Sequence, residues 1–179
     1  MKVVGVVGYP ASGKGELSLI AAEMGIPVVV MGDMIRRKVI EDGLTLTDEN
    51  IGAAARKLRA ELGMDAVAIL TAEEVGKLNP KIVVIDGIRG DAEVTYFKSV
   101  FNDFSLLAIT SSFETRLHRM KNRGRSDDTT TPETLHSRDV REESFGLGLA
   151  VSLADTQIEN ESTREKFIAQ IQNFLESLV

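Results

Sequence analysis

Cysteine is absent from this sequence of 179 residues, which excludes disulfides, thiolate zinc sites and a cysteine nucleophile. Histidine occurs only twice, as His118 and His136, and neither has an acidic partner at metal-ligand spacing, so we interpret both as surface residues. The chain also lacks an apolar run of the roughly 18 residues that a membrane span needs. Its apolar start, MKVVGVVG, is too short for a signal peptide. We therefore expect a cytoplasmic protein with no membrane partner.

The chain has fewer basic than acidic residues, and its formal net charge is −6. A general nucleic-acid binder is more often basic, so we expect no stable nucleic-acid partner, and any polyanion must meet a local basic patch. Hydrophobic residues make up 43% of the chain and charged residues 27%, a balance typical of a globular protein with one core. The length predicts a single domain over residues 1–179. The sequence carries no signal of oligomeric state.

Short apolar runs rich in β-branched residues alternate with segments of helical periodicity. The runs predict strands over residues 2–7, 26–31, 81–85 and 105–110, and a weaker strand near 156–158. Helices are expected after the first strand up to residue 25, over 33–42, after Thr47, over 66–78, from 111 to about 122, from Thr131-Pro132 and from 162 to the end. This alternation predicts an α/β fold around a parallel sheet of five strands. The pairs Ser111/Glu114 and Ser162/Glu165 predict capping boxes.

The stretch GYPASGKGEL follows the first strand and fits the pattern GxxxxGK. Glycines let successive backbone N–H groups point at phosphate oxygens, and a helix N-terminus and a lysine add positive charge. An ordinary glycine-rich turn is the alternative, but strand, lysine and helix together favour a phosphate-binding P-loop. The nucleotide-binding residues predicted here are Gly8, Pro10, Ala11, Ser12, Gly13, Lys14, Gly15 and Glu16.

The residues after Lys14 are unusual, because Gly15 and Glu16 stand where many P-loops have the serine or threonine that binds Mg²⁺. We favour an outward-facing Glu16 that complements the helix dipole over an inward one that repels phosphate. Asp86 ends the apolar run IVVID and is the candidate Mg²⁺ partner, acting through water. The alternative is a turn-forming Asp-Gly pair.

Basic residues outnumber acidic ones between residues 116 and 141, in a chain that is acidic as a whole. A helix, an arginine-bearing loop and a second helix are arranged as in a lid that closes over a transferring phosphoryl group and excludes water. We therefore predict a lid over residues 119–141. The alternative is a pair of exposed helices joined by salt bridges.

The GKG of the loop resembles adenylate kinases, and MGDMIRRK resembles their acceptor segment. This resemblance implies that Arg36 binds an acceptor phosphate. Arg89, in DGIRG, resembles their acceptor arginine but lies one residue earlier. Arg141 is a further candidate for acceptor binding.

The stretches RGRSDD and ETLHSR resemble the lids of nucleoside monophosphate kinases. By that resemblance Arg119 lies against the donor base, while Arg125 and Arg138 clasp the transferring phosphate. Asp127 and Asp128 match the acidic pair of those lids.

The segment LADTQIEN, residues 153–160, resembles the closing segment of dephospho-coenzyme A kinases, which implies that Asn160 lines the adenine site. Their second strand can also be aligned here, and it makes Asp33 the base that deprotonates a ribose hydroxyl. A phosphate acceptor needs arginines and no base, so the two readings stay open. A third possibility is that Asp33 only caps its own helix.

The stretches GIPVVVMGDMIR, LTLTDENIGAAARKLRAELGMDA and DGIRG followed by AEVTYF together resemble an archaeal P-loop kinase-like family related to both kinases, and this resemblance covers most of the chain. This implies a three-layer α/β/α P-loop NTPase fold, with an acceptor-binding helical segment over residues 33–80. The implied function is a small nucleotide kinase that uses ATP and Mg²⁺ to phosphorylate a nucleoside monophosphate or a dephospho-coenzyme A type of acceptor. The alternative is an ATP-binding switch or slow ATPase that works with a protein or RNA partner. ATP is favoured over GTP because no Asn-Lys-x-Asp motif is present.

Overall fold

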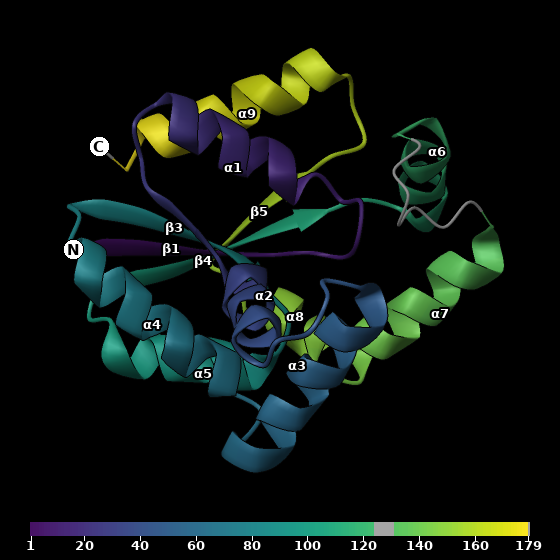
Figure 1. Cartoon of the computed structure of the whole chain (residues 1–179). Helices are drawn as coiled ribbons and strands as arrows, with labels where there is room; N and C mark the ends of the chain where they lie inside the picture. Colours follow the sequence, from purple (N-terminus) through teal and green to yellow (C-terminus); the bar gives the residue numbers. More distant parts are fainter. Residues whose placement is uncertain (124–130, 179) are drawn as a thin grey trace.

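One parallel five-stranded sheet forms the centre of the computed structural model, which describes residues 1–123 and 131–178 (Figure 1). Its strands are β1 (Lys2–Val7), β2 (Val28–Val30), β3 (Ile82–Ile88), β4 (Phe104–Thr110) and β5 (Thr156–Glu159), in the order β2-β3-β1-β4-β5. The predicted α/β fold with five parallel strands is confirmed. The second strand is shorter than expected, because Met31 already begins a helix.

Helices cover both faces of the sheet, which gives the three expected layers (Figure 1). On one face, α1 (Lys14–Glu23) and α9 (Arg164–Glu176) bury Leu17, Phe167 and Ile171 against β1 and β4. The other face is covered by α4 (Ala66–Leu78), α5 (Asp91–Val100) and α8 (Leu147–Ser152). Helices α5 and α8 were not expected from the sequence.

Four further helices lie toward the end of the sheet where the strands finish. They are α2 (Met31–Glu41), α3 (Asp48–Leu62), α6 (Phe113–Arg123) and α7 (Pro132–Glu143). Thr47 and Thr131 cap α3 and α7 by accepting hydrogen bonds from the N–H groups of Asn50 and Thr134, as the sequence suggested. No helix within the described residues is long and apolar enough to cross a membrane.

Three helices begin one or two residues away from the positions expected from the sequence. The cap of α6 is Ser112 and not Ser111, since the Ser112 hydroxyl accepts from the Thr115 N–H at 3.2 Å. Likewise Thr163, not Ser162, caps α9. Asp33 does not cap α2, because Val30 occupies the N-cap position and Asp33 lies inside the first turn.

A buried ion pair joins α3 to α5. The Arg59 guanidinium lies 3.2 Å from the carboxylate of Glu93 and 4.6 Å from the ring centre of Phe145. The same carboxylate accepts a hydrogen bond from the backbone N–H of Arg89 at 2.8 Å. Burial raises the pKa of Glu93, although the Arg89 N–H and Arg59 oppose the shift. This pair therefore anchors α3 beside the end of β3.

Glu161, just after β5, holds the start of α6. Its carboxylate accepts from the Thr115 hydroxyl at 2.7 Å, from the Ser112 hydroxyl and from the Ser112 N–H. These hydrogen bonds, the one from Thr115 first, lower the pKa of Glu161 to about 2. The carboxylate thus joins the chain before α9 to the N-terminus of α6.

We predict that Glu161→Gln lowers the free energy of unfolding near neutral pH. The carboxyl has a lower pKa in the folded chain, so its stabilisation is present above the ordinary pKa of about 4.5 and disappears as the pH falls toward 2. Urea unfolding at several pH values should show the difference from wild type shrinking over that range. Glu159→Gln, at an exposed neighbour, is the control. A difference that is constant from pH 7 to 2 would contradict the assignment.

Candidate active site

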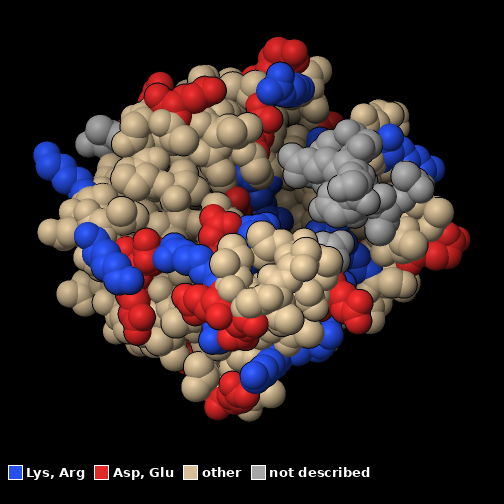
Figure 2. Space-filling model, viewed as in Figure 1, with Lys and Arg blue, Asp and Glu red and all other residues tan. Residues whose placement is uncertain are grey.

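A cleft of about 870 Å³ opens where the strands end, next to the loop between β1 and α1. We call residues 8–15 the glycine-rich loop. Figure 2 shows basic side chains inside a hollow that separates α1 and α9 from α2 and α3. The cationic residues that line the cleft come from six segments of the chain. They are Lys14, Arg36, Arg89, Arg119, Arg138 and Arg164, and the acidic ones are Glu16, Asp86 and Glu142.

Two glycines of the loop occupy positions that no side chain could take. A Cβ on Gly8 would lie 2.3 Å from the carbonyl oxygen of Ile109. Gly13 has φ +119°, and a Cβ there would lie 2.4 Å from the Asn160 amide nitrogen and 2.9 Å from the Phe167 ring. By contrast, Gly15 has no atom within 4 Å of the position of a Cβ. The loop is thus tightly packed underneath and open toward the cleft.

Lys14 is held at the base of the loop. Its ammonium donates to the carbonyl oxygens of Gly8 and Tyr9, the latter at 3.0 Å. Burial lowers the pKa of Lys14 to about 8, although Asp86 opposes the shift. In the same loop, the hydroxyl of Ser12 is buried and has no hydrogen-bond partner in the described residues. An unpaired donor in a cleft that also holds a cation suits the oxygen of an anion.

Asp86 lies near the end of β3 and lines the cleft, as its position in the sequence suggested. The Ser18 hydroxyl donates to its Oδ2 at 2.7 Å. Sequence reasoning missed Ser18, which lies one helical turn beyond the usual hydroxyl position. The signal was a serine four residues after the lysine, on the helix face that turns toward β3.

Glu16 pairs with the first residue of α9. Arg164 Nη2 lies 2.7 Å from its Oε1. The side chain therefore points toward α9, while Glu16 still lines the cleft, so the outward interpretation stays a prediction.

Arg119 and Asn160 come together at the loop, although they are 41 residues apart. Arg119 donates to the carbonyl and the side-chain oxygens of Asn160 at 2.7 and 2.9 Å. The Asn160 amide in turn donates to the carbonyl of Ser12 at 2.8 Å. Partial burial lowers the pKa of Arg119. Both residues line the same half of the cleft.

Arg116 was not recognised as a site residue, although it joins the loop to α7. It is almost fully buried, with its guanidinium 2.9 and 2.6 Å from the two oxygens of Asp139. It also donates to the carbonyl of Pro10 at 3.2 Å and lies over the Tyr9 ring. The partners are 23 residues apart, so local spacing gave no signal.

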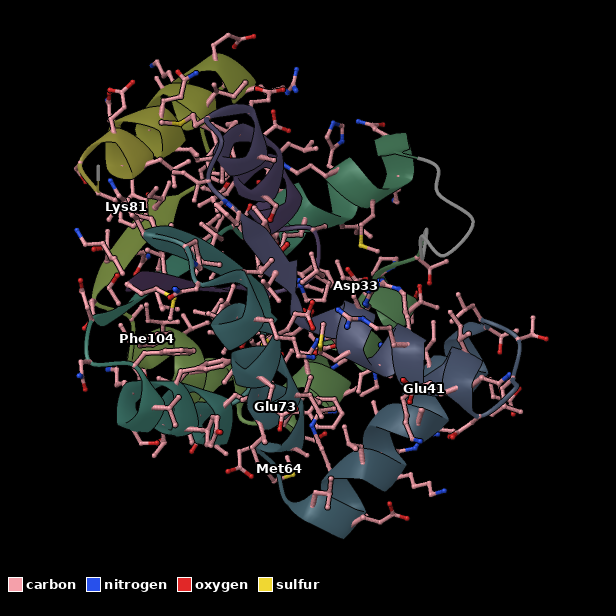
Figure 3. All side chains as sticks on the ribbon, turned by 60° about the vertical axis from the view of Figure 1, so that its left-hand side comes forward. Asp33, Glu41, Met64, Glu73, Lys81 and Phe104 are labelled. Carbon is pink, nitrogen blue, oxygen red and sulfur yellow. The ribbon has the colours of Figure 1, made fainter. Side chains whose placement is uncertain are left out.

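Of Arg36 and Asp33, the two residues of α2 predicted to bind the acceptor, one lines the cleft and the other does not. Arg36 lines the cleft and pairs with Asp33, and both side chains are about half exposed. Asp33 is not among the described residues that line the cleft. In Figure 3, Asp33 lies at the start of α2, away from Lys81 and Phe104, which lie near the starts of β3 and β4.

Glu142 was not predicted from the sequence either. Its carboxylate pairs with Arg89 and Arg141, the other two arginines predicted to bind the acceptor. It is buried, and Arg89 lies 3.0 Å from its carboxylate. Arg141 lies farther away, at 3.8 Å, and is outside the set of described residues that line the cleft.

Arg138 lines the cleft from α7, and its buried Nε has no partner in the described residues. Arg125, Asp127 and Asp128 lie outside the residues that the structure describes.

The sheet order and the loop ahead of α1 define a P-loop protein with a kinase-like fold. Residues 4–146 match the family described as AAA domain. A UPF0200 protein of Methanoculleus marisnigri is 55% identical over 175 residues, which cover 98% of this chain and 96% of that protein. The chain therefore belongs to the archaeal UPF0200 family. Its relation to adenylate kinase and dephospho-coenzyme A kinase stays a prediction.

Solved structures agree on the fold. TT1252 from Thermus thermophilus has a TM-score of 0.65 at 17% identity, and the alignment covers 99% of this chain and 98% of that one. A shikimate kinase from Bacteroides thetaiotaomicron has a TM-score of 0.60 at 13% identity, with 99% and 98% covered. These similarities show the fold alone.

We predict that Gly13→Ala destabilises the protein by about 1–3 kcal/mol, because the new methyl group meets Asn160 and Phe167 in a strained backbone conformation. Gly15→Ala is the matched control, since its methyl group would face open space and favour the helix. Urea unfolding measures both variants. Equal destabilisation by the two substitutions would show that the packing under the loop is described wrongly.

Proposed function

We propose that the chain is an ATP-dependent phosphotransferase that moves the γ-phosphate of ATP to a small nucleotide-like acceptor. The observation that carries the proposal is the convergence of cationic side chains from the loop, α2, the end of β3, α6 and α7 on one cleft. Phosphoryl transfer requires little covalent chemistry from the protein. It needs positioning and positive charge around the transferring group.

The donor half of the site is the side where the loop meets α6 and α9. The backbone N–H groups of residues 8–15 (Pro10 has none), the buried Ser12 hydroxyl and Lys14 would hold the phosphates. Arg119 and Asn160, joined to each other and to Ser12, would line the nucleoside. ATP is the proposed donor.

Asp86 fits a Mg²⁺ site that acts through water. One of its oxygens is oriented by Ser18, and Lys14 lies in the same cleft. No group of three or more ligating side chains occurs in the part of the chain that the structure describes, so phosphate oxygens and water would complete the coordination. Bound Mg²⁺ would neutralise phosphate charge. Asp86 would hold its water shell, and Lys14 and Arg138, with Arg125, would surround the transferring phosphate.

The acceptor half lies between α2 and the end of β3. Arg36 suits an anionic acceptor, because its guanidinium lines the cleft and its partner Asp33 is exposed. Asp33 faces Arg36, an arrangement that favours a phosphate-bearing acceptor over a hydroxyl that needs a base. Helices within residues 33–80 would cover this acceptor, and residues 119–141 would form the lid.

The alternative is an ATP-binding switch or slow ATPase with a protein or RNA partner. One observation favours it: Arg89 is already neutralised by buried Glu142 and would have to leave it to meet an acceptor.

Labelled ATP with Mg²⁺ and a panel of acceptors tests the proposal. The panel holds nucleoside monophosphates, dephospho-coenzyme A and shikimate, the last because of the structural neighbour. We expect labelled product with a nucleotide-like acceptor. Hydrolysis that no acceptor changes supports the switch instead. Asp33→Asn then separates the two acceptor types, since loss of a base costs about a hundredfold or more in turnover.

We predict that Arg36→Ala raises KM for the acceptor by about 10- to 100-fold, the cost of a lost charge-assisted hydrogen bond, and leaves KM for ATP near its wild-type value. Arg37→Ala is the control. Arg37 is the next residue of α2, but it pairs with Glu74 of α4 at 3.1 Å and is not among the described residues that line the cleft. Steady-state kinetics with each substrate varied in turn measures the effect. An equal rise in both KM values would argue against an acceptor role.

Lys14 gives a prediction on pH. Its pKa of about 8 means that the ammonium is present below that pH and is lost above it. Bound triphosphate favours the charged form, so ATP binding near pH 8 should take up as much as about half a proton, and ATP affinity should fall as the pH rises further. Calorimetry in buffers of different ionisation enthalpy measures the uptake. Lys14→Arg should bind without it, and an unchanged uptake in that variant would exclude Lys14 as its source.

A further inference from the structure

The chain before and within the first turn of α9 packs on the glycine-rich loop and on the first turn of α1 through three separate contacts. The Asn160 amide donates to the Ser12 carbonyl, and the Phe167 ring lies under Gly13. The third contact is the ion pair of Arg164 with Glu16. The first two contacts shape the backbone of the loop. The third contact pairs the charge of Glu16, and neither the proposed donor site nor the proposed acceptor site uses this ion pair.

Glu16 presents a physical problem for a phosphate-binding loop. It lies in the first turn of α1, two residues after Lys14, and lines the same cleft. A carboxylate there gains from the helix dipole, yet it repels any polyphosphate that the loop holds. The side chain is only 23% exposed, so water screens this repulsion incompletely.

Arg164 is placed against the preference of its own helix. It is the first residue of α9, and the N-terminus of a helix disfavours a cation. Its side chain is 72% exposed, so packing does not require an arginine. What the position provides is a guanidinium 2.7 Å from the Glu16 carboxylate.

We propose that Arg164 is a positioning residue for nucleotide binding, which holds Glu16 along the rim of the cleft and neutralises it so that the loop accepts a triphosphate. The proposal rests on the donor site described above. It explains how the helix that follows the loop can carry a carboxylate in its first turn. Arg164 acts through Glu16 and not by touching the nucleotide.

A double-mutant cycle on ATP affinity tests this inference. Calorimetry at low salt should show that Arg164→Ala weakens ATP binding by about fivefold, whereas Glu16→Gln does not weaken it. In the Glu16→Gln background, Arg164→Ala should have no further effect. Arg164→Lys should restore most of the affinity, and the effect of Arg164→Ala should shrink at high salt. Thermal unfolding of each variant checks that it is folded.

Lys166→Ala is the matched control, because it removes the same charge two residues further along α9, away from the cleft lining. Equal weakening by this control would indicate a general charge effect and overturn the proposal. So would a loss from Arg164→Ala that persists in the Glu16→Gln background, since that result means direct contact with the nucleotide. ATP binding by the wild type without any Arg164 effect contradicts this inference alone. A wild-type protein that binds no ATP contradicts the proposed function as well.

Discussion

The closeness of the glycine-rich loop to the elements beneath it is the constraint on which the site depends. Gly8 lies against the carbonyl of Ile109 in β4, and Gly13 lies against Asn160 and Phe167. Strand β4, the residue after β5 and helix α9 therefore fix the shape of the first loop of the chain. Their packing directs the open side of the loop, at Gly15, toward the cleft. A family member that changed β4 or α9 would also change the shape of its phosphate site.

Charge in the cleft follows from this packing. Burial next to other cations lowers the pKa of Lys14, and the desolvated ammonium stays in place through the loop carbonyls and Asp86. Concentrating guanidinium groups around it costs free energy unless acidic partners or an anionic ligand compensate. Glu142 and Asp139 compensate on the side of α7. The protein thus keeps a positive cleft inside a chain whose net charge is −6, which is the pattern expected for capture of a polyanion.

Sequence patterns that span a few residues predicted the structural features that depend on a few neighbouring residues. The five strands, the loop ahead of α1 and the caps at Thr47 and Thr131 were all visible in the sequence, because apolar runs, glycine spacing and hydroxyl caps act over a few residues. Arg116 with Asp139, and Arg89 with Glu142, were not visible, because the partners are 23 and 53 residues apart in the chain. The short helix α8 was also missed, since Leu147 and Ala150 offer too little periodicity to recognise. Such side-chain pairs can be identified only once the fold is known.

The two arginines proposed to bind an acceptor, Arg36 and Arg89, differ in what an acceptor would have to displace. Arg89 is fixed twice, through its backbone N–H by buried Glu93 and through its guanidinium by buried Glu142. Breaking such a pair leaves a buried carboxylate without compensation. Arg36 pairs with Asp33, and both are half exposed, so an anion can replace Asp33 at little cost. An incoming acceptor should therefore engage Arg36 first. Arg89 would then join only if α7, which carries Glu142, moves with it, and acceptor binding would in that way be coupled to α7.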